Sequence, residues 1–317
     1  DLNEPLIQIK EEHTHVWLDL PVAFDYGDVF EAPPTLLKAR NMRSLIFPYN
    51  SAFCDIDASS VERVVLKCKS LRALNLSSWE IKVIPDSIGG LIHLRYLNLA
   101  SNTALEYLPD AITRLQNLQT LNLKGCLQLK ELPREFSKLT KLRHLAISKT
   151  RLTDIPSGFV NMTSLQELDW FPVGKTSGID ALPVSNLVGN LKIEFKVWHS
   201  NAVLEAERAN LNNSLQLVSL KLDFFYYMSP KIGEEEEEEA AFREMDQVLM
   251  RLRLPPNLRY FTVENYDGIE VPRRWLDGLV KLISIKITRC HNCRVLPHLS
   301  RLPCLKYIYL DLTVCMP

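Results

Sequence analysis

The chain repeats one leucine pattern at nearly constant intervals. Four consecutive segments follow the spacing Leu-x-x-Leu-x-(Leu/Ile), and a Leu-Pro or Ile-Pro pair follows each of them: residues 71–76, 94–99, 118–123 and 142–147. Equivalent leucines lie 23, 24 and 24 residues apart, the interval at which each repeat adds one short strand to a stack of coils. We therefore seek the function on a repeated surface and not in a single pocket.

A single coil of this length cannot fold alone. In the period from Leu94 to Asn117, seven apolar residues can point inward, and their burial does not offset the conformational entropy of the whole coil. Neighbouring coils must supply the difference, which is the physical basis of the leucine-rich repeat. The pattern therefore predicts many stacked coils.

Weaker copies of the pattern extend over most of the chain. They are Leu18-x-Leu20, Leu45-x-Phe47, Leu168-x-Trp170, Leu191-x-Ile193, Leu220-x-Leu222, Phe261-x-Val263, Ile285-x-Ile287 and Ile308-x-Leu310. The interval stays at 23 residues from Leu145 to Leu168 and from Leu168 to Leu191. It lengthens to 29 before Leu220, across a helical pattern of Val203, Ala206, Ala209 and Leu211, and to 41 before Phe261, across the acidic run 234–239.

These copies predict an α/β leucine-rich-repeat solenoid, a horseshoe of about twelve turns with a parallel concave sheet and an irregular convex side. We expect one domain over residues 1–317. Within it we expect degenerate N-terminal turns at 1–60, regular repeats at 61–170, irregular repeats with the acidic insertion at 171–257, and C-terminal repeats at 258–317.

Composition excludes several classes of function. The apolar fraction is 46%, the net charge is −1, and no apolar stretch is long enough to cross a bilayer. We therefore expect neither a membrane span nor nucleic-acid binding. Seven cysteines, an odd number without paired spacing, favour a reducing compartment. We expect the cytoplasm, with the nucleus and the membrane periphery as alternatives. The chain begins at Asp1 without methionine or signal peptide, which we interpret as a piece of a larger protein.

Two motifs that suggest binding chemistry have simpler interpretations. Cys290-x-x-Cys293 resembles half a zinc site, but no second pair follows at the required spacing. Gly174-Lys175-Thr176 resembles the end of a phosphate loop, yet Asp169 stands where the first glycine is needed. We predict no metal, no nucleotide and no other cofactor in this chain.

The remaining chemistry-bearing residues favour a structural role. Cys126 and Cys290 fall at the repeat position that usually holds Asn or Cys, which Asn102 and Thr150 occupy in other turns. No Ser/His/Asp or Cys/His constellation and no pair of carboxylates stands out. We therefore predict that the chain is not an enzyme.

Two long stretches carry a more specific resemblance. Residues 168–222 run from LDWFPVGKTSGIDALPVSNLVGNLKIEF to SLQLVSLKL, and residues 255–310 contain PPNLRYFTVENYDG, VPRRWLDGLVKL and CHNCRVLPHLSRLPCLKYIYL. Both are similar to the repeat domain of plant coiled-coil nucleotide-binding leucine-rich-repeat disease-resistance receptors. Departures include Ser300 in place of the usual glycine, and the first fifty residues match poorly.

The resemblance implies a domain that holds a nucleotide-binding module inactive and senses a pathogen effector, directly or through a guarded host protein. It also implies that ATP or ADP binds in that module, which is absent from this chain. Partner contacts are expected from alternate residues of the inner strand face. For autoinhibition these are Arg72, Asn75, Arg95, Tyr96, Asn98, Lys124, Arg143, His144 and Lys149. For the effector they are Asp169, Tyr260, Glu264, Lys286, Arg289, Tyr307 and Tyr309.

Two other functions are compatible with a leucine-rich-repeat chain. One is a cytoplasmic scaffold or regulatory subunit, such as a small-GTPase effector, for which we would expect a regular 23-residue period and a ladder of asparagines. The corresponding residues here are Trp79, Asn102, Cys126 and Thr150, and the period varies. The other is a ubiquitin-ligase substrate adaptor, but no F-box-like helix precedes the repeats within these 317 residues.

Overall fold

The computed structural model describes residues 13–17, 29–30, 36–47, 55–56, 58–196, 202–224, 250–266, 268–290, 293–296 and 299–311. The chain divides into two compact units, Asp1–Leu152 and Thr153–Pro317, called unit 1 and unit 2 below. The boundary falls inside the stretch for which we predicted regular repeats. None of the helices in the described ranges is long and apolar enough to cross a membrane.

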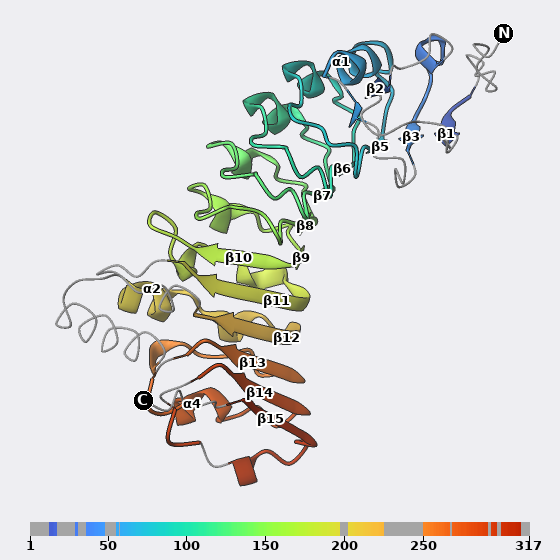
Figure 1. The fold of residues 1–317 in the computed structure, drawn as a ribbon. Helices are drawn as coiled ribbons and strands as arrows, with labels where there is room; N and C mark the ends of the chain where they lie inside the picture. Colours follow the sequence, from blue (N-terminus) through green and yellow to red (C-terminus); the bar gives the residue numbers. More distant parts are fainter. Residues whose placement is uncertain are drawn as a thin grey trace, which may run out of the picture. The chain divides into compact units, whose positions relative to one another are not determined.

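Unit 1 is a stack of coils with strands along one side and short helices along the other (Figure 1). Its parallel strands pair in the order β1 (His15–Trp17), β3 (Ser44–Ile46), β5 (Ala73–Asn75), β6 (Tyr96–Asn98), β7 (Thr120–Asn122) and β8 (His144–Ala146). The two-residue strands β2 (Val29–Phe30) and β4 (Asp55–Ile56) pair separately. The helices are η1 (Leu36–Lys38), α1 (Ala58–Lys67), η2 (Asp86–Gly90), η3 (Asp110–Arg114) and η4 (Phe136–Lys138).

The repeat sequence explains both sides of each coil. Strands of three residues bury only the central leucine, as Leu97 and Leu121 do, while their neighbours face outward. On the other side, Pro85 and Pro109 precede the 3-10 helices η2 and η3 in extended conformation. Proline fixes φ and lacks an N–H, so it suits the position just before a helix. The four regular repeats predicted at residues 71–76, 94–99, 118–123 and 142–147 are therefore confirmed.

A buried polar ladder ties adjacent coils of unit 1 together. The Asn102 side chain accepts hydrogen bonds from the backbone N–H groups of Trp79 and Ile81 and donates to the carbonyls of Leu76 and Leu99, at 2.7–3.1 Å. One turn later, the Cys126 thiol donates to the Leu99 carbonyl at 3.2 Å. Burial raises the pKa of the Cys126 thiol to about 12, so it remains a protonated donor. The structural role that we predict for this repeat position is confirmed for Asn102 and Cys126.

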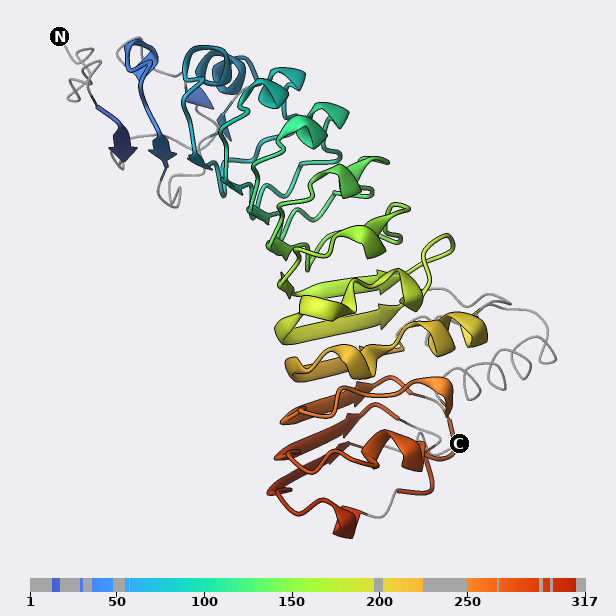
Figure 2. The same cartoon turned by 180° about the vertical axis from the view of Figure 1, so that it is seen from behind.

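Unit 2 has longer strands around a parallel sheet. After β9 (Glu167–Leu168), the sheet follows the order β10 (Trp170–Val173), β11 (Val188–Phe195), β12 (Gln216–Asp223), β13 (Tyr260–Glu264), β14 (Ser284–Thr288) and β15 (Tyr307–Asp311). Its helices are η5 (Phe159–Asn161), η6 (Ile179–Ala181), η7 (Val184–Asn186), α2 (Ala202–Arg208), η8 (Leu211–Asn213), α4 (Arg273–Leu276) and η10 (Leu299–Arg301). Figure 2 shows α2 and α4 on the same side of this sheet.

Aromatic side chains fill the core of unit 2. Phe195 and Phe224 stack with ring centroids 4.8 Å apart, and Tyr266 lies 5.7 Å from Phe224. Trp275 of α4 meets Phe261 edge-on at 5.7 Å. Tyr266 stands at the repeat position that Asn102 occupies in unit 1, and its hydroxyl donates to the Glu270 carbonyl at 2.9 Å. Large rings therefore take over much of the role that hydrogen-bonding side chains have in unit 1.

Two register predictions are wrong. Strand β1 places Val16 beside Leu45, whereas we had aligned Leu18 with Leu45; residues 18–20 lie outside the described ranges. In unit 2, Trp170 pairs with Lys192, one residue away from the predicted alignment of Leu168 with Leu191. The cause is a bend at Asp169, which separates β9 from β10.

Two intervals between repeats are longer than the others, and the first of them contains the helix that the sequence predicts. The predicted helical stretch forms α2, with Ala206 and Ala209 buried, and continues into η8 at Leu211. Leu220 still pairs with Leu191 across the interval of 29 residues, and the offset between β11 and β12 changes by one residue between Gly189 and Asn190. The acidic run 234–239 lies outside the described residues.

Candidate protein-binding surfaces

Backbone hydrogen bonds between adjacent coils align equivalent side chains into columns. Counting the first leucine of each repeat as position 1, the carbonyl at position 2 accepts two N–H groups from the next coil. The Arg72 carbonyl, for example, accepts from Arg95 and Tyr96 at 2.8 and 3.0 Å. Adjacent parallel strands lie about 4.8 Å apart. Residues at one position therefore follow one another at that spacing along unit 1.

Position 2 carries a column of exposed arginines. We call Arg43, Arg72, Arg95 and Arg143 the arginine column; Gln119 interrupts it in the fourth of these five coils. None of the four guanidinium groups has an ion-pair or hydrogen-bond partner for its side chain within the described ranges. The column therefore places like charges on neighbouring strands without compensation inside the described part of unit 1.

Asn75 and Asn98, which we predicted as partner contacts, have structural bonds. The Oδ1 of Asn98 accepts the N–H of Ala100 at 3.0 Å, and the Oδ1 of Asn75 accepts that of Ser77 at 3.1 Å. Asn122 on β7 repeats the contact with Lys124. These asparagines hold the chain as it leaves each strand, so their side chains are half-buried and already engaged.

The other predicted residues of unit 1 are accessible to different degrees. Tyr96 and His144 share position 3 on β6 and β8, with Tyr96 exposed and His144 half-buried. Lys124 and Lys149 are exposed at positions 7 and 8. Lys149 has a left-handed backbone with φ of 59°, as does Ser101 at the same position. Position 8 therefore has a fixed turn conformation in successive coils.

The strand face of unit 2 carries interleaved acids and bases. Lys192 lies 2.7 Å from Glu194 on its own strand and 2.8 Å from Asp223 on the next strand. Lys221 forms an ion pair with Glu264, which also faces Arg289 at 3.8 Å, and Lys196 forms one with Glu194. We call these seven residues the charge ladder: Lys192, Glu194, Lys196, Lys221, Asp223, Glu264 and Arg289.

Protonation equilibria reflect this pairing. Burial alone would raise the pKa of Glu194, but hydrogen bonds and charges from Lys192 and Lys196 outweigh it and hold that pKa below its ordinary value. For Lys192, burial acts to lower the pKa, and the bonds to Asp223 and Glu194 raise it overall. Trp170 also donates its indole N–H to Glu194 at 2.9 Å. Glu194 and Lys192 are therefore both charged at neutral pH and compensate each other.

The structure separates the predicted effector contacts into two groups. Glu264 and Arg289 face each other within the charge ladder, and Asp169 is half-buried at the bend between β9 and β10. The tyrosines are open to solvent. Tyr260 is 47% exposed, Tyr307 66% and Tyr309 56%, and the Lys286 ammonium lies 4.9 Å from the centre of the Tyr309 ring.

The Gly174-Lys175-Thr176 loop already holds an anionic side chain. The Thr176 N–H and hydroxyl both donate to Asp154 Oδ2 at 2.8 Å, and the Ser177 hydroxyl donates to Asp154 Oδ1. Burial acts to raise the pKa of Asp154, and these hydrogen bonds outweigh it and lower the pKa. A carboxylate of this chain thus occupies donors that a phosphate loop would offer to a nucleotide.

Cys290 and Cys293 are both buried. The Cys290 thiol donates to the Thr288 carbonyl at 3.3 Å. Burial raises the pKa of Cys293, which disfavours the thiolate that a zinc ion requires. No group of three or more His, Cys, Asp or Glu residues suited to a metal gathers within the described ranges.

Several surface residues were missed in the sequence. Arg43 lies two residues before Leu45, as Arg72 lies two residues before Leu74. The weak leucine pattern of the first repeats obscured this equivalence. The charge ladder also had a signal. Lys192-Ile-Glu194 and Lys221-Leu-Asp223 place a base and an acid two residues apart on adjacent strands. Residues two apart on a strand share a face, so both pairs could have been assigned to one surface.

Comparison with known proteins gives the family. A family model described as "Leucine-rich repeat region" matches residues 42–316. The chain is 39% identical over 262 residues to "Putative disease resistance protein RGA1" of Solanum bulbocastanum, covering 81% of this chain and 25% of that protein. It is 33% identical over 275 residues to "Putative disease resistance protein At3g14460" of Arabidopsis thaliana, covering 84% of this chain and 19% of that protein. The chain thus spans about a quarter or less of these relatives.

The solved structures agree on the fold. The chain superposes on the plant peptide hormone receptor RGFR1, solved in complex with RGF2, with a TM-score of 0.56 at 19% identity, covering 96% of this chain and 50% of that one. Identity this low supports the solenoid fold alone. The family model matches residues 42–316, and the relatives named above are disease resistance proteins. The chain therefore belongs to the leucine-rich repeat family and is a repeat region of the kind found in plant disease resistance proteins.

Proposed function

We propose that the chain is the ligand-sensing and autoinhibitory repeat domain of an intracellular plant immune receptor, located in the cytoplasm. It has no catalytic activity and no cofactor in this proposal; ATP or ADP would bind a separate nucleotide-binding module of the same receptor. The disease resistance relatives support the immune context. The division of labour within the chain rests on the two strand faces.

One observation carries the autoinhibitory role: the arginine column has no acidic partner in the described part of the chain. Like charges on adjacent strands repel, at a cost on the order of 1 kcal/mol or less per neighbouring pair in water. A partner surface of acidic residues would remove that repulsion and gain charge-assisted hydrogen bonds. The receptor's own nucleotide-binding module is the partner we assign to this column. Lys124, exposed at position 7 of the coil that carries Gln119, adds a further positive charge to the surface of unit 1.

Unit 2 offers a different surface for the pathogen effector or guarded host protein. Its charges are largely compensated in the ladder, and its exposed tyrosines, Tyr260, Tyr307 and Tyr309, offer large contact area at low entropic cost. Such a surface selects a partner by shape and aromatic contact more than by net charge. We therefore assign effector recognition to unit 2.

One experiment tests both assignments in the full receptor. Charge reversal of Arg72, Arg95 and Arg143 to Glu should release defence signalling without effector, whereas reversal of Arg114 and Arg134, two exposed arginines away from the strands, should not. In the second arm, Tyr307→Ala with Tyr309→Ala should leave the receptor quiet and abolish its response to effector. A quiet, normally accumulating triple-reversal receptor contradicts autoinhibition through the column, and a full effector response of the tyrosine variant contradicts the second assignment.

A further inference from the structure

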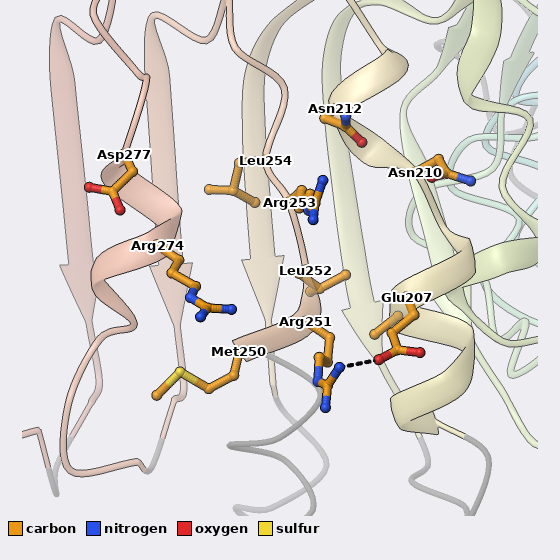
Figure 3. A pocket seen from close by; sticks show the side chains of 11 residues that line it. Glu207, Asn210, Asn212, Met250, Arg251, Leu252, Arg253, Leu254, Arg274 and Asp277 are labelled. Carbon is orange, nitrogen blue, oxygen red and sulfur yellow. Dashed lines mark hydrogen bonds and ion pairs between the residues drawn. The ribbon is translucent and has the colours of Figure 1, made fainter.

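A cavity of about 850 Å³ lies on the helix-bearing side of unit 2, away from the strand face used above. Helix α2, the segment 250–254, α4 and the turn residues between them line it (Figure 3). Its volume is within the range of small-molecule sites, about 300 to 1,000 Å³. The cavity therefore has room for a metabolite-sized ligand.

Local sequence explains how arginines come to line this cavity. In the segment Arg251-Leu-Arg253-Leu, the leucines are buried and the arginines are exposed. Arg251 is helical and residues 252–254 are irregular, and the two exposed arginines flank an apolar base formed by the buried leucines. In α4, Trp275 and Leu276 are buried, which leaves Arg274 exposed.

The three guanidinium groups are not equivalent. Arg251 forms an ion pair with Glu207 of α2. Arg253 and Arg274 have no side-chain partner within the described part of the chain. Figure 3 shows Arg274 extending from α4 toward the segment 250–254, while Arg251 points toward Glu207. Two guanidinium groups that have no side-chain partner among the described residues therefore line this cavity.

The side chains that line the cavity restrict the chemical class of ligand that it can bind. Guanidinium groups bind phosphate through parallel, charge-assisted N–H···O bonds. Asp277 lines the same cavity, and a carboxylate repels phosphate but accepts hydrogen bonds from hydroxyl groups. Asn212 is also in the lining, and its amide can both donate and accept. A ligand that carries phosphate and hydroxyl groups matches all of these side chains.

We propose that this cavity binds a small phosphorylated polyol, with Arg253 and Arg274 holding its phosphate groups and Asp277 accepting from its hydroxyls. The site is independent of the proposed partner surfaces, because it uses neither the strands of unit 2 nor any residue of unit 1. A bound metabolite would stabilise unit 2, since any ligand that binds only the folded state does so by mass action.

Isothermal titration calorimetry with fructose 1,6-bisphosphate, inorganic pyrophosphate and a hexaglutamate peptide as probes tests this proposal. We expect saturable one-to-one binding of the sugar bisphosphate. Arg253→Gln with Arg274→Gln should weaken it by about tenfold or more, and Asp277→Asn should weaken it while leaving pyrophosphate unaffected or stronger. The control is Arg273→Gln, which removes the same charge from the adjacent residue, where Arg273 pairs with Glu270 at 3.2 Å outside the cavity; it should change affinity by less than about twofold.

Three results would overturn the proposal. They are the absence of saturable binding of the sugar bisphosphate at millimolar concentration, equal loss of affinity in Arg273→Gln, and tighter binding of hexaglutamate than of either phosphate probe. The last result would assign the cavity to an acidic peptide. Circular dichroism of each variant checks that the fold is retained, and hydrogen exchange at Leu252 and α4 reports whether binding occurs at this cavity.

Discussion

Units 1 and 2 use the same repeat but handle polarity in opposite ways. Unit 1 buries a polar ladder inside its coils, centred on Asn102, and its described residues include no partner for the charges of the arginine column on its surface. Unit 2 fills its core with rings such as Phe195 and Phe224 and neutralises its surface in the charge ladder. The repeat therefore constrains the backbone while leaving both core chemistry and surface charge free to differ.

The largest expected effect comes from removing the buried polar ladder. Asn102→Ala leaves the N–H groups of Trp79 and Ile81 and the carbonyl of Leu76 without their partner, whereas the Leu99 carbonyl keeps Cys126. Each orphaned buried group costs about 1 to 3 kcal/mol, so for three groups we expect a loss of roughly 3 kcal/mol or more in the free energy of unfolding. Urea denaturation followed by circular dichroism gives this value.

Thr150→Ala is the matched control for that prediction. Thr150 occupies the same repeat position, but its hydroxyl makes a single bond, to the Ile147 carbonyl at 2.8 Å. We expect a cost of about 1 kcal/mol. If the two variants lose the same stability, the ladder does not hold unit 1 together through Asn102.

The contrast between the units also explains which parts of the sequence were informative. The leucine spacing predicted β5 to β8 because each three-residue strand needs one buried central residue, and Leu74, Leu97, Leu121 and Leu145 supply it. Periodicity failed at Asp169, where a bend changes the register by one residue. A one-residue slip exchanges the two faces of a strand. The spacing of leucines along the sequence does not reveal such a slip.

Surface roles were less accessible to sequence reasoning than the fold. Arg72 and Arg95 could be placed on one surface from spacing alone. Pairing across strands could not, so Glu264 and Arg289 were predicted as separate contacts although they face each other. Whether a charge is free depends on the neighbouring strand, and the sequence offset between paired strands of unit 2 varies from 22 to 41 residues.

A smaller effect is expected from the charge ladder. Glu194→Gln keeps the shape of the side chain and an oxygen for the Trp170 indole, but removes the charge that faces Lys192 and Lys196. Unpairing a fully buried ion costs about 3 to 5 kcal/mol. Because both lysines are about 30% exposed, at 31% and 29%, we expect only about 1 to 2 kcal/mol. Hydrogen exchange at β11 and β12, measured at pH 7, reports the loss locally.

The same variant has a defined pH dependence. The pKa of Glu194 is lowered in the folded chain from an ordinary value of 4.5. Its contribution is therefore present in full above pH 4.5 and is lost as the pH falls through the folded pKa. The stability difference between the native chain and Glu194→Gln should shrink on acidification below pH 4.5. A constant difference would show that Glu194 acts through packing and not through its charge.

The smallest effect is expected from the arginine column, and its sign distinguishes the two units. Arg95 is flanked by Arg72 on the preceding coil and has no carboxylate partner within the described ranges. Arg95→Gln should therefore leave the free energy of unfolding unchanged or raise it by less than about 1 kcal/mol.

The stability gained in Arg95→Gln should fade as salt rises from 0.05 to 0.5 M, since the screening length falls from roughly 14 to 4 Å. In the charge ladder, salt screens attraction instead, so added salt should reduce the cost of Glu194→Gln. Urea denaturation at both salt concentrations measures the two trends. If Arg95→Gln destabilises the chain by more than about 1 kcal/mol, Arg95 has a partner within the chain. Arg95 would then not be available to an acidic module, which contradicts the proposed role of the arginine column.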